Sequence, residues 1–139
     1  MGLQWREQLS VGNELIDGDH KHLIDLVNQA EESLKTKSTE GIKTVLGGLA
    51  SYAVSHFARE ELVAKAAGYP DVEKMHGSHE ALVAELAKLT EELGTEVSEA
   101  GAQHLITFVR EWLINHVIKE DLLMKPFLTK FSPKFDPRK

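Results

Sequence analysis

The chain has 139 residues and no cysteine. It is therefore the size of one domain with a core of its own, and any metal would have to be bound by His, Asp and Glu. Sixteen basic and 22 acidic residues give a formal net charge of −6, so no nucleic-acid or anionic-membrane surface is expected. No apolar run is long enough to span a membrane and residues 1–8 lack the features of a signal peptide, so we expect a cytoplasmic protein without a membrane span.

Glycine and proline residues divide the sequence into an arm, four long segments and a tail. In each long segment apolar residues recur three and four positions apart, the spacing of an amphipathic helix. We treat residues 1–139 as a single domain, with an arm over 1–16, helices over about 17–37, 39–67, 70–93 and 98–125, and a tail over 126–139.

The sequence also indicates where the fourth segment ends and what the tail does. Pro126 is expected to end the last helix, because proline lacks the N–H that a helix interior requires. The basic tail is expected to be an irregular strap, with Phe127, Phe131 and Phe135 packing against the rest of the molecule.

No segment shows the period-two alternation of a half-buried strand. Helices of 20 to 30 residues are rods of about 30 to 45 Å, and short connections between them make neighbours antiparallel. The sequence therefore predicts an all-α fold, an up-down-up-down antiparallel four-helix bundle with an N-terminal arm. We expect a monomer, because this core is sufficient by itself.

Each predicted helix places a histidine on or beside its apolar face. A single such imidazole is most often an ordinary core residue, but several buried in one bundle require hydrogen bonds or a metal. Of two further histidines, His22 is expected at the surface, and His104 is expected to be structural or exposed. The four candidate metal ligands are His20, His56, His79 and His116.

Carboxylates accompany two of these imidazoles. His56 and Glu60 are four residues apart and share one helix face. After His116, Glu120 follows at four residues and Asp121 at five; an ideal helix favours Glu120, whereas a distorted turn would allow Asp121. Nitrogen and carboxylate ligands suit iron, manganese or zinc, and two bridging carboxylates suggest two metals.

A known di-iron bundle template uses a Glu-x-x-His pair from each of two helices. This sequence has one such pair, Glu73 and His76, so that template fits poorly.

Several motifs in chain order resemble those of bacterial hemerythrins. They are Trp5, the run from Leu9 to Asn28 with Ile16-Asp17-Gly18-Asp19-His20, then His56-Phe57-Ala58-Arg59-Glu60-Glu61, Gly68-Tyr69-Pro70 and the run from Trp112 to Asp121. The resemblance extends from residue 5 to about residue 128. It implies a four-helix bundle whose two iron ions, joined by an oxo or hydroxo bridge, bind O₂ reversibly.

The resemblance also implies a role for each candidate ligand. His20 and His56 would bind the iron that takes O₂, and His79 and His116 the other iron. Glu60 and Asp121 would bridge the two, which favours Asp121 over Glu120. Core residues near these ligands would also form the walls of an apolar O₂ pocket, namely Leu23, Trp112 and Leu113.

The third predicted helix departs from the family pattern His-x-x-x-His, because Met75 stands four residues before His79 and the imidazole follows at His76. In one register Met75 and His79 point inward with Leu82, Leu86, Leu89 and Leu93. In the other, His76 and Glu80 point inward with Val83, Ala87, Thr90 and Gly94, which packs less well.

The seventh ligand position is therefore open between His76, Met75, Glu80 and water. A thioether is a soft, weak donor for iron, so Met75 is expected to be a packing residue.

Four functions follow from these observations. The first is an O₂ carrier, store or supplier with a redox or oxygen-accepting partner still to be identified. A di-iron peroxidase or oxidase is the alternative that the altered iron site motivates, and an oxygen-sensing or iron-sensing module is a third. A helical interaction domain without metal is the fourth.

Overall fold

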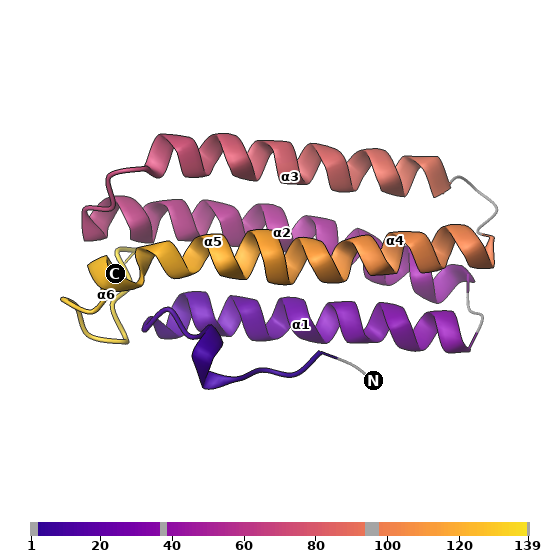
Figure 1. Cartoon of the computed structure of the whole chain (residues 1–139), viewed down its shortest axis with the longest axis horizontal. Coiled ribbons are helices and arrows are strands. Elements are labelled where there is room, and N and C mark those ends of the chain that lie inside the picture. The colour runs from indigo at the N-terminus through magenta and orange to yellow at the C-terminus, as the bar shows by residue number, and fades with distance from the viewer. Residues whose placement is uncertain (1–2, 37–38, 94–97, 139) are drawn as a thin grey trace.

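The structure is a computed structural model that describes residues 3–36, 39–93 and 98–138, apart from a few side chains within the helices. Three long helices are α1 (Glu14–Lys35), α2 (Thr39–Ala67) and α3 (Val72–Leu93). The fourth rod consists of α4 (Glu99–Glu111), the π-helical segment η2 (Trp112–Ile118) and α5 (Lys119–Asp121). Successive rods run in opposite directions (Figure 1), so the predicted antiparallel four-helix bundle is confirmed.

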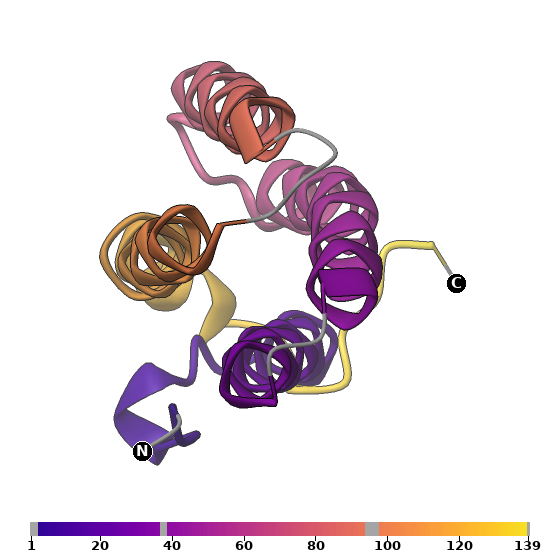
Figure 2. The same ribbon diagram turned by 90° about the vertical axis from the view of Figure 1, so that its right-hand side faces the viewer.

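Seen end-on, α1 lies between α2 and the fourth rod, and α3 lies across the bundle from α1 (Figure 2). The main core between the rods includes Leu23, Leu49, Leu86 and Trp112, all fully buried. A second apolar cluster lies at the end where α2 passes to α3. It consists of Val11, Ile16, Val63, Ala64, Met75, Met124 and Leu128.

The helix ends follow local hydrogen bonding. Helix α1 begins at Glu14, earlier than the expected residue 17, because the Asn13 side chain accepts a hydrogen bond from the Ile16 N–H. Helix α2 ends in a Schellman motif, in which the Gly68 N–H binds Lys65 O and the Tyr69 N–H binds Ala64 O. Gly68 has φ +83°, a conformation that side chains rarely adopt.

The end of the fourth rod differs from the prediction. Helix α5 ends at Asp121, and a 3₁₀ turn, η3 (Leu122–Met124), leads into the short helix α6 (Lys125–Leu128). Pro126 lies in the first turn of α6, where no N–H is needed, and so it begins this helix instead of ending the long one.

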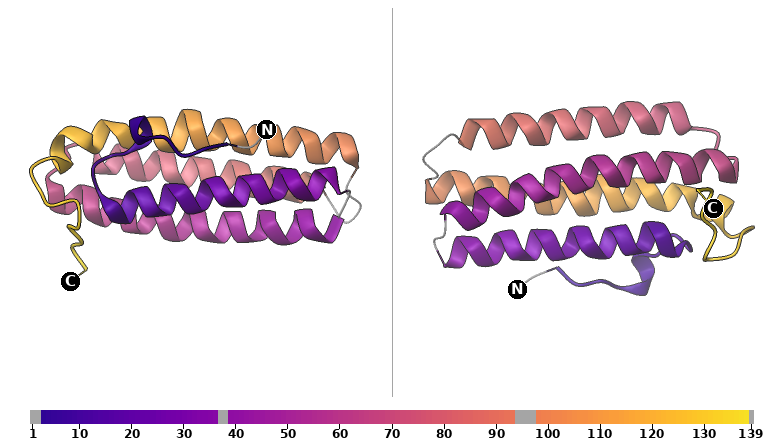
Figure 3. Two further views of the ribbon diagram at one scale, coloured as in Figure 1. Left: turned by 90° about the horizontal axis from the view of Figure 1, so that it is seen from below. Right: turned by 180° about the vertical axis from the view of Figure 1, so that it is seen from behind.

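Arm and tail are both fastened to α1, and the arm runs alongside that helix (Figure 3). The Leu3 N–H donates to Asn28 Oδ1 at 2.8 Å, and Asn28 Nδ2 donates back to Leu3 O at 2.9 Å. In the tail, Pro133 O accepts from the Glu14 N–H at 2.7 Å. In the tail, the Phe127 ring packs against Tyr69 as expected, whereas the rings of Phe131 and Phe135 stack on each other.

Over the described residues, none of the helices combines the length and the apolar character that crossing a membrane requires.

The left-handed backbone at Gly68 makes a testable prediction. We expect Gly68→Ala to lower the free energy of unfolding by about 1 kcal/mol, measured by urea denaturation. Gly47→Ala is the matched control: Gly47 lies in the interior of α2 with open space where the added Cβ would lie, and the substitution should raise stability by up to about 1 kcal/mol. Equal effects of the two substitutions would contradict the role of the Schellman motif.

Candidate metal centre

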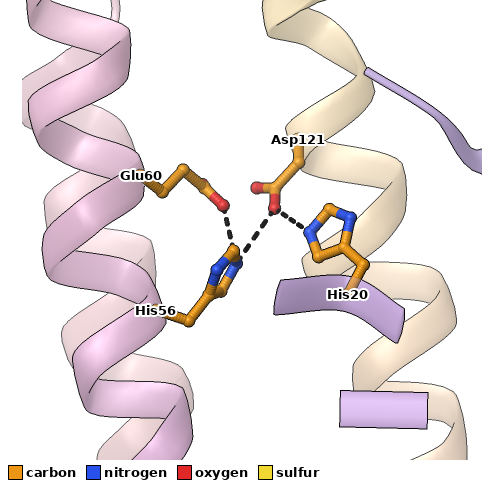
Figure 4. Close-up of side chains that lie close together, drawn as sticks. All are labelled: His20, His56, Glu60 and Asp121. Carbon is orange, nitrogen blue, oxygen red and sulfur yellow. Dashed lines mark hydrogen bonds and ion pairs between the residues drawn. The ribbon is translucent and has the colours of Figure 1, made fainter. Parts of the chain in front are cut away.

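Three rods of the bundle bring four polar side chains together in its interior (Figure 4). His20 comes from α1, His56 and Glu60 from α2, and Asp121 from α5. All four residues are fully buried. Each offers one ligand atom, and these atoms lie within 4.8 Å of one another. A metal ion bound there would be enclosed by protein.

The contacts within this buried cluster are short. His20 Nε2 lies 2.6 Å from Asp121 Oδ2, and His56 Nε2 lies 2.8 Å from Glu60 Oε2 and 3.4 Å from Asp121 Oδ2. Even so, His56 Nε2, both Glu60 oxygens and Asp121 Oδ1 are buried without a well-aligned hydrogen bond. Buried polar atoms that face a common point but do not satisfy one another fit a bound cation.

The π-helical segment η2 explains how Asp121 reaches the cluster. A π-helix closes its hydrogen bonds from i to i+5, so residues five apart share a face more nearly than they do in an α-helix. The structure thus brings Asp121 into the cluster. Glu120 instead accepts a hydrogen bond from Ser78 Oγ at 2.9 Å and is partly exposed.

His79 is connected to the cluster through Glu60, with its Nε2 3.1 Å from Glu60 Oε1. Its other nitrogen, Nδ1, lies 2.9 Å from Glu61 Oε2, and its ring is stacked on Phe57 at 3.9 Å. Glu60 therefore stands between His79 and His56. The predicted ligand His116 belongs to η2, but its side chain lies outside the described part of the chain.

Helix α3 adopts the first of the two predicted registers. Met75, His79, Leu82 and Leu86 are buried, whereas His76 and Glu80 are exposed. The expected inward side chains of Leu89 and Leu93 lie outside the described residues. The register that pointed Glu80 inward, with Val83, Ala87, Thr90 and Gly94, is therefore wrong for the described positions.

The structure brings none of the three candidate side chains for the seventh ligand position, His76, Met75 and Glu80, into the cluster. His76 lies at the surface, where Nδ1 is 2.6 Å from Glu61 Oε1 and Nε2 is 2.5 Å from Glu80 Oε1. Met75 packs in the second apolar cluster with Ile16 and Met124. The thioether is thus a packing group, as its chemistry predicts.

The residues proposed from sequence as pocket walls, Leu23, Trp112 and Leu113, are completely buried in the main core. The indole Nε1 of Trp112 has no hydrogen-bond partner. The other two histidines, His22 and His104, are exposed as expected.

Burial and charge shift the acidities in the cluster in opposite directions. Burial first, and then the neighbouring Asp121 charge, raise the pKa of Glu60 to about 8. Burial alone would also raise the pKa of Asp121, but hydrogen bonds with Glu60, His20 and His56 outweigh it and hold that pKa well below its usual range. Without metal, then, Glu60 keeps a proton near neutral pH and Asp121 does not.

Two imidazoles that contact Glu60, those of His56 and His79, have raised pKa values. Burial opposes the charge of His56, yet Asp121, Asp19 and Glu60 raise its pKa well above the ordinary value. For His79, burial is likewise outweighed by Glu60 and Glu61, which raise the pKa. A cation would have to displace these protons, so its binding will strengthen as pH rises.

Asp19 is a carboxylate that the sequence pattern did not indicate, and it lies on the side of His56 away from the cluster. Asp19 is 4 % exposed and lies 2.9 Å from His56 Nδ1. Tyr52 and Arg59 also donate to it. Their positions four before and three after His56 place them on its helix face, a signal that could have been noticed; the pairing with Asp19 depends on how α1 packs against α2.

Comparison with known proteins agrees with this geometry. The model of the hemerythrin HHE cation-binding domain matches residues 11–128. A bacteriohemerythrin of Methylococcus capsulatus is 34 % identical over 113 residues, which is 81 % of this chain and 86 % of that protein. One of Pseudomonas aeruginosa is 27 % identical over 86 % of this chain and 76 % of its own length.

A solved wild-type hemerythrin superposes with a TM-score of 0.77 at 30 % identity, covering 91 % of this chain and 98 % of the other. The fold and the buried ligand set define a four-helix protein with an internal cation site. More particularly, the chain belongs to the hemerythrin HHE cation-binding family.

The raised pKa of Glu60 predicts how the metal-free protein responds to pH. Between pH 4.5, the ordinary pKa of a glutamate, and about pH 8, the raised pKa of Glu60, the folded chain keeps a proton that the unfolded chain has released. The free energy of unfolding should therefore fall as pH rises through this range, on the order of 1 kcal/mol per pH unit.

The raised pKa of His56 also makes the free energy of unfolding fall with pH above 6.5, the ordinary imidazole pKa. Glu60→Gln should therefore reduce the dependence of stability on pH but not abolish it. Urea denaturation of chelator-treated protein at several pH values measures the effect. A free energy of unfolding that rises between pH 4.5 and about 8 would contradict the raised pKa of Glu60.

Proposed function

We propose that this protein binds two iron ions at the buried cluster and through them binds O₂ reversibly, as a carrier, store or supplier. The observation that carries the proposal is the set of fully buried imidazole and carboxylate groups that face one another while His56 Nε2, both Glu60 oxygens and Asp121 Oδ1 have no hydrogen-bond partner. Family membership supports the choice of function, since relatives are named bacteriohemerythrin. Imidazole and carboxylate also bind manganese and zinc, so the metal itself needs measurement.

In this proposal His20 and His56 bind one iron, His79 and His116 bind the other, and the carboxylates of Glu60 and Asp121 bridge them. The position of Glu60 between His56 and His79 supports the bridging role. When bound, the iron pair supplies the electrons needed to hold O₂ reversibly.

The chain supplies the surroundings of that chemistry. Leu23, Trp112 and Leu113 close the interior with fully buried apolar surface, which keeps bulk water away from the cluster. The burial of Glu60 and Asp121 fixes their oxygens against neighbouring rods, so the ligand spacing is set before a metal arrives. These residues therefore position the site and exclude water.

A second candidate, a di-iron oxidase or peroxidase, rests on α3. With Met75 in an apolar cluster and His76 at the surface, one imidazole of the family pattern has no replacement among the described side chains. A metal at the His79 side would then have a position for water or peroxide. Steady peroxide-dependent oxidation of a reducing dye, above that of free iron, would support this candidate.

The test of the main proposal is iron content together with the visible spectrum. We expect two iron ions per chain, no colour after anaerobic reduction, and a charge-transfer band that appears with O₂ and disappears when O₂ is removed. A spectrum that passes at once to a stable oxidised form would favour the oxidase alternative. A chain that binds no iron would overturn both.

Adjacent carboxylates at the end of the fourth rod offer a matched pair of variants. Asp121→Ala should lower iron affinity at least about tenfold, since it removes a buried bridging group. Glu120→Ala should bind iron as the wild type does, because its carboxylate is hydrogen bonded to Ser78 outside the cluster. Chelator competition measures both, and the reverse order of effects would show that the cluster is not the iron site.

The altered position in α3 makes a further prediction. Met75→His restores the family pattern and should slow spontaneous oxidation of the O₂-loaded protein by about tenfold, by adding an imidazole. The rate of decay of the visible band measures this. His76→Ala is the control and should leave the rate unchanged; a faster decay in that variant would mean that His76 serves the centre after all.

A further inference from the structure

Asp19 is a buried carboxylate whose two oxygens are hydrogen bonded to three side chains of α2. Its Oδ2 lies 2.9 Å from His56 Nδ1 and 2.9 Å from Arg59 Nε. Its Oδ1 accepts from Arg59 Nη2 at 2.9 Å and from the Tyr52 hydroxyl at 2.6 Å. The whole network joins α1 to the face of α2 that carries His56.

His56 is consequently held at both ring nitrogens. Nδ1 faces Asp19, while Nε2 faces the buried cluster at 2.8 Å from Glu60. A carboxylate can only accept at Nδ1, so the imidazole carries its proton there and leaves Nε2 free for a metal. His20 differs, because its Nδ1 is buried without any partner. The two imidazoles of one metal are thus held differently.

We propose that Asp19 is a positioning residue of the metal centre, which fixes the tautomer and ring orientation of His56 by accepting its Nδ1–H. This inference rests on the proposed metal site, but not on the identity of the metal or on O₂ binding. Outer carboxylates of this kind raise the basicity of a metal-bound imidazole and strengthen metal binding.

Tyr52 and Arg59 set the strength of that interaction. Arg59 holds both oxygens of Asp19 with a planar fork and lies over the Tyr52 ring at 5.3 Å. Each donor draws negative charge away from the carboxylate. Removing one donor while the others keep Asp19 in place should therefore strengthen its pull on the His56 proton.

The test uses the full-length chain loaded with zinc, a diamagnetic ion that imidazole and carboxylate bind well. Zinc affinity is measured by chelator competition, and the Nδ1–H of His56 by proton NMR. Asp19→Asn should lower affinity about tenfold to a hundredfold, shift this resonance upfield and speed its exchange with water. The asparagine keeps the shape of Asp19 but is a weaker acceptor.

The matched control is Asp17→Asn, the same substitution on the same helix. Asp17 binds the arm, accepting from Ser10 Oγ and the Val11 N–H, and should affect folding stability but not the His56 resonance or zinc affinity. Tyr52→Phe is expected to move the resonance downfield, opposite to Asp19→Asn. If Asp19 had only a structural role, Tyr52→Phe and Asp19→Asn would shift the His56 resonance in the same direction.

The results distinguish a failure of the positioning role of Asp19 from a failure of the metal site. If wild-type protein binds zinc and Asp19→Asn matches it in affinity and resonance, the positioning role is overturned while the metal site stands. Equal losses in Asp19→Asn and Asp17→Asn would overturn it as well. If the wild type binds neither zinc nor iron, the metal site and this inference fail together.

Discussion

The constraint on which the structure depends is the burial of two imidazoles and two carboxylates at one point of a helical bundle. Such groups are costly to remove from water, and here several of their polar atoms, both Glu60 oxygens among them, face one another without a hydrogen-bond partner. The apolar faces of the four rods keep water out, so compensation must come from protons or from a cation. A fold that keeps these groups buried despite the free-energy cost is arranged to bind protons or a cation.

The bundle solves the problem by dividing the ligands among separate rods. Helix α2 provides both an imidazole and a carboxylate on one face, at the i,i+4 spacing of His56 and Glu60. Helix α1 and the fourth rod bring His20 and Asp121 from either side. Since the four side chains come from three rods, packing of the rods sets the size and shape of the site.

Much of this arrangement was predictable from sequence, because helical periodicity is a local property and the bundle follows from four apolar faces. Spacing alone also placed His56 with Glu60. It could not decide between Glu120 and Asp121, because the wide turn over Trp112–Ile118 is a departure from the α-helix on which the spacing argument relied. Asp19 was overlooked for a different reason: its partner lies on another helix, 37 residues away.

Met75 and His76 show a further limit. The spacing of leucines in α3 correctly indicated the inward register, yet it could not say what an off-register histidine would do. At the surface His76 contacts Glu80, four residues on in the same helix, and Glu61 of α2, and the second contact depends on the packing of α2 beside α3. A short-range pattern thus identifies which face is buried, but not the partners that an exposed face acquires.

The order of the ligands along the chain has a consequence for biosynthesis. His20 and Asp121 touch within the cluster although 101 residues separate them, and the start of α1 is also tied to Pro133 and Phe135. While the ribosome is still making the fourth rod, the first three can pair but the cluster lacks its last carboxylate. A cation that needs all four side chains therefore binds only after Asp121 and the fourth rod have been synthesised.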